Sequence, residues 1–394
     1  MAPRLSKRAF GWLDRRFGLG AVLDRLLDDP VPERGGWWYT FGAALFVLFL
    51  LQVLTGLFLL FYYEPTIERA RESVLYIQQE ALLGWAVRGF HYWNMVLLVA
   101  LVGIHLLRTF VSAAYKAPRE LTWVLGVLLL LLMVATAYTG VILRWDQAAY
   151  FDLVVGLRIT ELTPVVGPWL AELWRGGEVI NPHSLLRTFA FHIFLFPLTL
   201  LAVALVHIGL VVLLGQYGSW INYEPDQSGA PLTEEQAASR RKLEEELLDP
   251  KSRKVNLPAR TTFFWPFHVF KEGVVTFGFF LLDLLLVLWF AAPIEGPVDP
   301  ATTEYAPAAL RVFLFFDQAL LLFAGTWLVP AANVVPLLMV LTLALWPWLD
   351  SSPEVRPSGR LAGLAFMLAL IGVIFTFAFM AASRIYNFEF INHP

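Results

Sequence analysis

Long apolar segments constrain the fold of this chain more than any other feature. Seven runs are each close to the ~20 residues that a helix needs to cross a bilayer. They cover approximately residues 37–62, 85–111, 121–143, 187–214, 274–292, 327–346 and 361–383. We therefore predict an all-α fold, a polytopic transmembrane helix bundle with seven spans. Eight spans is the alternative, because the stretch 309–349 is too long for one crossing and Pro330 and Pro336 interrupt it.

Composition narrows the class of protein further. Apolar residues make up 58% of the sequence and charged residues only 15%, against about 25% charged residues in soluble domains. There is no cysteine, which excludes a disulfide scaffold and a zinc site of thiolates. The net charge of −3 and the lack of a basic face argue against a nucleic-acid partner, so the expected surroundings are a lipid bilayer.

Charge distribution predicts the orientation and the domain boundaries. Most of the 29 basic residues fall on one side of the predicted spans, which the positive-inside rule assigns to the cytoplasm together with the N-terminus. The expected location is a prokaryotic inner membrane. Four parts are predicted: a cytoplasmic amphipathic segment 1–36, a four-span bundle 37–215, a charged cytoplasmic linker 216–262, and a three-span domain 263–394 with an outer-side loop 293–326.

Four of the seven histidines lie within two of the predicted spans. His91 and His105 are 14 residues apart in the second span, and His192 and His207 are 15 apart in the fourth. At about 100° and 1.5 Å per residue, each pair lies on one face of its helix, about 21–22 Å apart along the axis. Polar side chains at membrane depth are costly and therefore indicate function.

The matching separations define two levels in the membrane, each with one histidine from each helix. Two imidazoles are too few for a structural zinc site, but they suit the two axial positions of a haem iron. We predict two non-covalent b-type haems, between His91 and His192 near the outer side and between His105 and His207 near the cytoplasm. Hydrogen-bonded packing histidines are the alternative for any one of the four considered alone.

Glycines in two other spans repeat this period. Gly42 and Gly56 in the first span, and Gly126 and Gly140 in the third, are also 14 residues apart. A flat macrocycle needs neighbouring helices without side chains at its level, and glycine meets that need. Small-residue helix packing is the alternative, because it is common in membranes.

Two arginines lie about one helical turn beyond the predicted haem levels. Arg88 precedes His91 by three residues, and Arg108 follows His105 by three. Both are placed to pair with haem propionates. Snorkelling of the charged group to the membrane surface is the other interpretation.

Several motifs make the chain resemble cytochrome b of the quinol-oxidising cytochrome bc complexes. The connection from Lys116 to Trp123 is closest to the chloroplast-type branch of that family, as is the 15-residue histidine step in the fourth span. In that branch the two halves are separate polypeptides, whereas here the linker joins them. The motifs are Gly42, Gln52-Val53-Leu54-Thr55-Gly56, Lys116-Ala117-Pro118-Arg119-Glu120-Leu121-Thr122-Trp123, Trp145-Asp146-Gln147, Pro164-Val165-Val166-Gly167, Arg187, His192, Pro197 and His207.

The resemblance implies a four-helix haem-binding bundle plus three further helices, in a homodimer. It also implies the electron-transfer function of a quinol–cytochrome c reductase subunit in a respiratory chain. Quinol is oxidised at an outer site, and one electron passes to a Rieske iron–sulfur protein and then to a cytochrome c. The other electron crosses the membrane through the two haems to an inner quinone site. Arg187 is implied as a cofactor-binding residue.

The quinone sites depart from the family pattern. The family's outer-site glutamate aligns with Leu310, and Asp317 or Glu304 is the candidate substitute for it. At the inner site, Lys271 and Glu272 resemble the family's Lys-Asp pair and are candidate proton donors, against a plain pair of charges at a helix start. Asp283 lies in the middle of the fifth predicted span and is not assigned to a position of the family pattern. A carboxylate at membrane depth suggests either a proton path or a polar contact with a partner.

Two other classes of function are alternatives to a quinol–cytochrome c reductase subunit. A haem-containing membrane anchor of another dehydrogenase or reductase leaves the last three spans unexplained. A haem-free transporter would be expected to show broken helices in two repeated halves, and no such repeat is visible. The sequence does not distinguish ubiquinone from menaquinone as the substrate.

Overall fold

The computed structural model describes residues 36–214, 261–302 and 333–374, together with residues 11, 12, 14, 16, 30–32 and 376. The predicted segment 1–36 and linker 216–262 lie almost wholly outside these ranges. Much of the predicted outer loop, with Asp317, Glu304 and Leu310, also lies outside the described residues.

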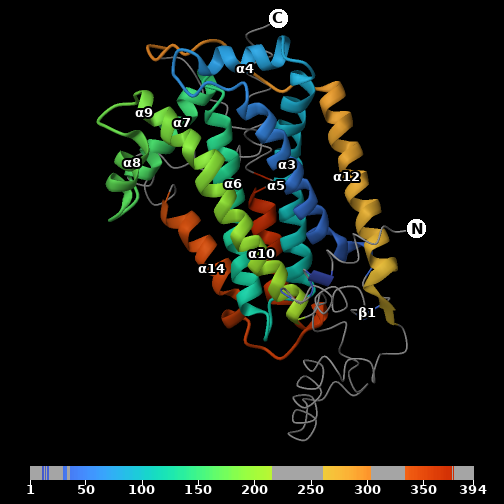
Figure 1. Cartoon of the computed structure of the whole chain (residues 1–394). Coiled ribbons are helices and arrows are strands. Elements are labelled where there is room, and N and C mark those ends of the chain that lie inside the picture. The colour runs from blue at the N-terminus through green and yellow to red at the C-terminus, as the bar shows by residue number, and fades with distance from the viewer. Residues whose placement is uncertain are drawn as a thin grey trace, which may run out of the picture.

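A bundle of long helices forms the body of the molecule (Figure 1). The first half contains the 3-10 turn η2 (Trp37–Thr40), α3 (Phe41–Leu60), α4 (Ala70–Gln79), α5 (Gly84–Val111), α6 (Glu120–Ile142), α7 (Gln147–Glu161), α8 (Gly167–Arg175), α9 (Pro182–Ala190), the π-helical segment η3 (Phe191–Leu195) and α10 (Phe196–Leu214). The second half contains the π-helical segment η4 (Phe264–His268), α12 (Val269–Trp289), α14 (Val335–Leu349), the 3-10 turn η7 (Pro357–Gly359) and a final apolar helix, Leu361–Ile374.

The predicted all-α membrane bundle is confirmed. Within the described ranges, five helices are long and apolar enough to cross a membrane, and the shorter α14 and Leu361–Ile374 lie at the sixth and seventh predicted spans. The one β pairing among the described residues joins β1 (Pro30–Pro32) antiparallel to β2 (Thr261–Phe263). This backbone pairing brings a segment that precedes the first span next to the segment that precedes α12.

Two predicted spans begin later in the sequence prediction than in the structure. The fourth starts at Pro182, because Asn181 caps it by accepting a hydrogen bond from the backbone N–H of His183 at 2.8 Å. The fifth starts at Phe264 and ends at Trp289. Its first turns carry the charged residues Lys271 and Glu272. An apolar run therefore begins only after them, which is why the predicted span starts later.

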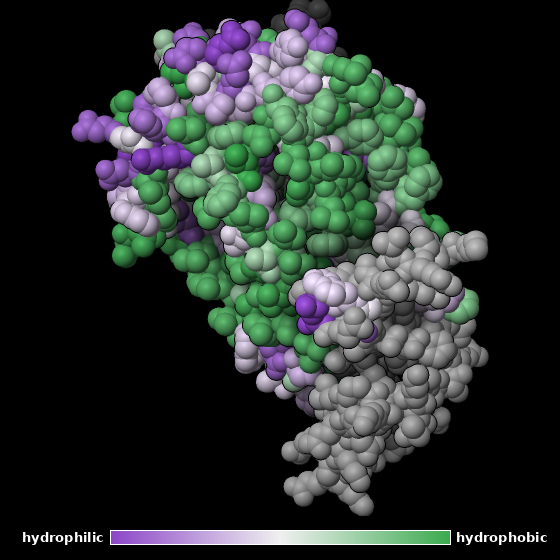
Figure 2. All heavy atoms as spheres, in the orientation of Figure 1, coloured by the Kyte–Doolittle hydropathy of each residue, from purple (hydrophilic) through white to green (hydrophobic). Residues whose placement is uncertain are grey.

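The surface has the pattern of a membrane protein. Large apolar side chains such as Leu54, Leu205 and Leu288 are more than half exposed. Figure 2 shows apolar surface over the middle of the bundle with hydrophilic residues concentrated towards its ends. An exposed apolar belt of this extent is expected where lipid replaces water.

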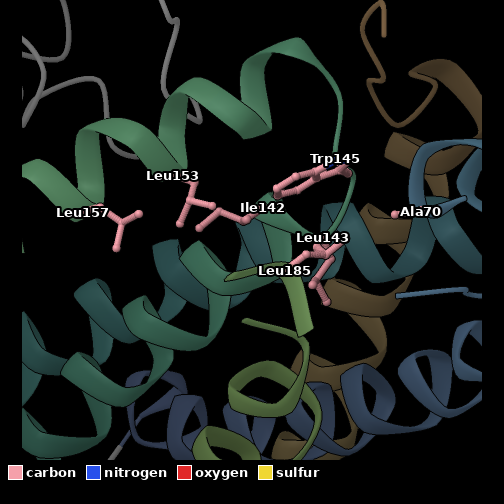
Figure 3. Packing of buried hydrophobic residues seen from close by; sticks show 7 residues of the cluster. All are labelled: Ala70, Ile142, Leu143, Trp145, Leu153, Leu157 and Leu185. Atoms are coloured by element: carbon pink, nitrogen blue, oxygen red, sulfur yellow. The ribbon is translucent and has the colours of Figure 1, made fainter. Parts of the chain in front are cut away.

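Short helices cover one end of the bundle. A cluster of buried side chains joins α4, the end of α6, α7 and α9 there (Figure 3). Its members are Ala70, Ile142, Leu143, Trp145, Leu153, Leu157 and Leu185. This packing fixes the turn after α6, which carries Arg144 and Trp145.

Candidate functional site

Two of the four span histidines come together inside the bundle. The ring centroids of His91, on α5, and His192, on η3, are 6.1 Å apart, and the two ring planes are nearly perpendicular at 81°. One level further along, His105 on α5 faces Gly42 and His207 on α10 faces Gly126. At the first level the structure therefore brings one histidine from each helix together, and a metal held by either pair stays a prediction.

Hydrogen bonds select the form of the His192 ring. Its Nδ1 lies 2.9 Å from the backbone carbonyl oxygen of Thr136. A carbonyl only accepts, so Nδ1 carries the proton and Nε2 keeps its lone pair. An imidazole with a free Nε2 lone pair is a metal ligand.

His91 has the same arrangement through a threonine side chain. The hydroxyl of Thr55 lies 3.0 Å from Nδ1 of His91 and 2.9 Å from the carbonyl oxygen of Leu51. A hydroxyl has one proton, so donation to Leu51 leaves its oxygen to accept from Nδ1–H. Gln52 supports the same turn, because its side-chain amide donates to the His91 carbonyl oxygen at 2.8 Å.

Each of the four predicted glycines faces one of the four histidines. A Cβ at Gly56 would lie 3.1 Å from Cε1 of His91, and a Cβ at Gly140 would lie 2.5 Å from Cε1 of His192. The corresponding distances for Gly42 to His105 and for Gly126 to His207 are both 3.4 Å. Glycines on α3 thus make room for histidines on α5, and those on α6 for histidines on η3 and α10.

A cavity of about 260 Å³ opens around the first histidine pair. Since one water molecule needs only ~10–15 Å³ of such space, the cavity accommodates a large ligand. Its walls include the residues Gln52, Gly56, Arg88, His91, Gly140, Arg144 and His192. Apolar residues make up most of the remainder, as is typical of cofactor sites.

These observations fit an axially ligated haem. Two metal–imidazole bonds of about 2.0 Å each, plus the distance from each nitrogen to its ring centre, put the centroids about 6 Å apart, close to the observed separation. Among the described residues no group of three or more His, Cys, Asp or Glu side chains could hold a metal ion by itself. A metal here would depend on a macrocycle for its other ligands, as haem iron does.

The predicted arginines make protein contacts in the structure. Arg88 donates to Gln78 Oε1 at 2.7 Å and to the carbonyl oxygens of Ala292 and Pro293. The guanidinium of Arg108 stacks on the ring of Tyr39 at 3.7 Å. Arg88 also lines the histidine cavity, so it remains within reach of a ligand there.

Arg187 lies apart from the histidine cavity. Its guanidinium donates to the carbonyl oxygens of Glu172 and Leu173 at the end of α8. It therefore joins α9 to α8, and a direct role at the cofactor stays a prediction.

The predicted inner-site pair lies at the start of α12, at the end of the bundle opposite α4 (Figure 1). Glu272 Oε1 is 3.4 Å from Nε2 of the buried His268. Lys271 is half-buried beside it. Asp283, further along α12, is fully buried, and neither carboxylate oxygen has a hydrogen-bond partner among the described residues.

The sequence prediction missed the residues that orient the histidines. Thr55 and Thr139 each directly precede one of the glycines facing the first pair, and the Thr139 hydroxyl lies 3.4 Å from His192 Nδ1. The repeated Thr-Gly dipeptide was a visible signal for this level. At the second level Phe41 and Leu125 precede the glycines.

The fold and this geometry define a class: a polytopic membrane protein whose helix bundle presents paired imidazoles across an internal cavity. Residues 26–216 match the family model for cytochrome b/b6/petB. The chain therefore belongs to the cytochrome b/b6 family. As in that family, it is an electron-transport membrane protein that carries b-type haem.

Individual relatives support the assignment. The cytochrome b subunit of a menaquinol:cytochrome c reductase from Geobacillus thermodenitrificans is 37% identical over 208 residues, which is 51% of this chain and 93% of the relative. Cytochrome b6 of Pyropia yezoensis is 36% identical over 200 residues, covering 51% of this chain and 93% of the relative. The cytochrome b subunit of a cytochrome bc complex from Chlorobaculum thiosulfatiphilum is 39% identical over 207 residues, 52% and 48% of the respective chains.

A solved structure extends the fold similarity to nearly the whole chain. A chain titled "Hyperthermophilic respiratory Complex III" aligns with a TM-score of 0.74 and 24% sequence identity, covering 96% of both chains. The second half therefore shares its fold with that chain as well.

Proposed function

We propose that this chain is the di-haem subunit of a quinol:cytochrome c oxidoreductase. His91 and His192 would hold one b-type haem, and His105 and His207 the other. The single observation that carries the proposal is the first pair of imidazoles, 6.1 Å apart across a cavity with both Nδ1 atoms engaged. The relatives named as menaquinol:cytochrome c reductase subunits supply the reaction class.

The residues around each haem would have distinct tasks. Thr55 and the Thr136 carbonyl hold the Nδ1 protons, which would keep both Nε2 atoms available to bind the haem iron. The glycines facing each ring exclude side chains that would displace the imidazoles. Arg88 supplies positive charge to the cavity wall. When bound, the two haems supply one-electron oxidation and reduction at two depths in the membrane.

The two levels support a direction of electron flow across the bilayer. The second histidine pair lies about 21 Å further along α5, at 1.5 Å per residue. We infer that quinol is oxidised at the outer side, near the first pair, and quinone is reduced near the cytoplasm. With the N-terminus cytoplasmic, the positive-inside rule gives this orientation.

The remaining site residues and partners belong to the same proposal. Lys271 and Glu272 are proposed as proton donors at the inner quinone site, and Asp317 as a proton acceptor at the outer one. Gly42 and Gly126 serve the second haem, with Arg108 and Arg187 as further cofactor-binding residues. The proposed partners are a Rieske protein, a cytochrome c and a second copy of the chain.

Quinol-driven reduction tests the reaction. Menaquinol and ubiquinol are added separately to the purified complex, and the visible absorbance of reduced b-type haem and the reduction of added cytochrome c are followed. We expect at least one quinol to reduce both the haem and cytochrome c, and His91→Ala to abolish steady-state turnover. Haem that neither quinol reduces would contradict the quinol function and favour an anchor of another reductase.

A further inference from the structure

Arg144 lines the same cavity as His91 and His192. It lies four residues after Gly140, just before Trp145, whose positive φ of 49° turns the chain out of α6. Its side chain is only 14% exposed. A buried guanidinium in a cavity wall needs partners, because an uncompensated buried charge is costly.

Among the described residues, the contacts that Arg144 makes are all long. Its Nε lies 3.4 Å from the Val141 carbonyl oxygen, its Nη1 3.4 Å from that of Pro293, and its Nη2 3.5 Å from Asp146 Oδ1. Normal N–H···O hydrogen bonds measure about 2.7–3.2 Å. Since none of its five N–H donors makes a full-strength bond to a residue that the structure describes, Arg144 is able to bind another acceptor.

Arg88 differs in this respect. Its three hydrogen bonds, to Gln78, Ala292 and Pro293, measure 2.5–2.8 Å. Much of its donor capacity is therefore used within the protein. Of the two arginines on this cavity, Arg144 has the greater unused capacity.

The carboxylate of Asp146, 3.5 Å from Arg144, is engaged mainly by other hydrogen-bond donors. Asp146 is fully buried and accepts from the backbone N–H groups of Ala149 and Glu295, both at 2.9 Å. Asp146 therefore caps α7 and joins it to Glu295 in the second half of the chain. None of the described residues that line the cavity carries a carboxylate, so the two guanidiniums give this described wall an excess of positive charge.

We propose that Arg144 is a second carboxylate-binding residue, which holds a propionate of the haem between His91 and His192. This inference rests on the proposed function. Both arginines lie about one turn beyond the histidine level, towards the α4 end, and a haem carries two carboxylates. Guanidinium binds carboxylate in a bidentate fork. Because reduction adds negative charge, losing this cation should lower the reduction potential of that haem.

A potentiometric titration of the intact complex tests the proposal. In Arg144→Gln, the ratio of reduced to oxidised haem at a fixed potential should fall about tenfold for one haem, equivalent to ~59 mV for one electron. The other haem should be unchanged, and Arg144→Lys should recover most of the shift. Arg158→Gln is the matched control, because Arg158 is 68% exposed on α7 and pairs with Glu161.

The alternatives give different results. If Arg144→Gln leaves both midpoint potentials unchanged while two haems remain bound, Arg144 does not hold a propionate. If only the KM for quinol changes, Arg144 faces the quinol head group instead and the proposal is wrong. A shift that Arg144→Lys does not reduce would indicate a structural effect and also contradict it. Absence of haem in the unmodified protein overturns the proposed function and this inference together.

Discussion

At the scale of single residues, the site depends on which nitrogen of each imidazole carries a proton. The Thr136 carbonyl and the Thr55 hydroxyl fix Nδ1–H in His192 and His91. Both partners bind Nδ1 and leave Nε2 free of them. Their effect on a ligand is therefore one of orientation and basicity of Nε2.

Removing the Thr55 hydroxyl should weaken the first site without unfolding the bundle. Thr55→Val keeps the side-chain shape but leaves His91 Nδ1 without its acceptor. We expect haem at this level to dissociate about 10–100-fold more readily, measured by transfer to apomyoglobin. Thr199→Val is the control, since Thr199 donates only to the Leu195 carbonyl oxygen on the exposed side of α10. Equal haem loss from both variants would contradict the role of Thr55.

At the scale of helices, glycine positions on α3 and α6 set how closely the histidine helices approach. The tightest is Gly140, where an added Cβ would lie 2.5 Å from the His192 ring. Contacts below 3.0 Å force a neighbour to move. The helix itself tolerates alanine better than glycine, so any loss would come from the contact.

Gly140→Ala should therefore reduce haem occupancy at the first level while leaving helix content unchanged. We expect one of the two haems to be lost or to titrate heterogeneously, as counted by the pyridine haemochrome method with far-UV circular dichroism as the fold check. Gly103→Ala is the control, because nothing lies within 4 Å of a Cβ there. Full occupancy in Gly140→Ala would show that the ring contact is unimportant.

The sequence predicts the spans and the histidine faces well because both follow from helical periodicity. His91 and His192 could be paired by residue counting alone. The short helices α4, α7 and α8 could not be predicted this way, since they are too short to span a membrane and their apolar residues pack only after distant segments meet. The place of Arg144 in the cavity could not be predicted from the sequence, because it depends on the Trp145 turn.

At the scale of the whole molecule, the two halves are fastened at both ends of the bundle. At one end Asp146 accepts from Glu295 N–H, and Gln147 Oε1 accepts from Asp299 N–H at 2.6 Å. At the other end Lys116 pairs with Asp350 at 2.9 Å, and Arg360 donates to the Tyr115 hydroxyl at 2.7 Å. Tyr115 in turn donates to Asp350.

This second contact should make stability depend on pH. Burial works to raise the pKa of Asp350, but hydrogen bonds from Tyr115, Ser352 and Lys116 outweigh it and lower the pKa below 3.8. Because this folded pKa is depressed, the contribution is present above the unfolded value and is lost as pH falls below about 4. Burial, followed by the hydrogen bond to Asp350, raises the pKa of Tyr115 to about 12, so its contribution is lost between pH 10 and 12.

Asp350→Asn should lower stability by about 1–3 kcal/mol near neutral pH and flatten the acid limb of the pH profile. Thermal unfolding in detergent between pH 3 and 8 measures both effects. Glu354→Gln is the control on the same loop. An unchanged acid limb in Asp350→Asn would mean that another group controls it.

The contacts at both ends predict that the linker is dispensable for assembly. With a protease site placed within residues 216–262, cleavage should leave the two fragments co-purifying with bound haem. Size-exclusion chromatography with haem absorbance measures this. Separation of the fragments in mild detergent would show that the covalent connection is required.

The central claim is that each haem is shared by one histidine from α5 and one from η3 or α10. The most direct measurement is the haem count per polypeptide, with a potentiometric titration, in the four single His→Ala variants. The account predicts two haems in the unmodified protein, loss of one and the same haem in His91→Ala and His192→Ala, and loss of the other in His105→Ala and His207→Ala. Loss of different haems in His91→Ala and His192→Ala, or two haems in all four variants, would contradict it.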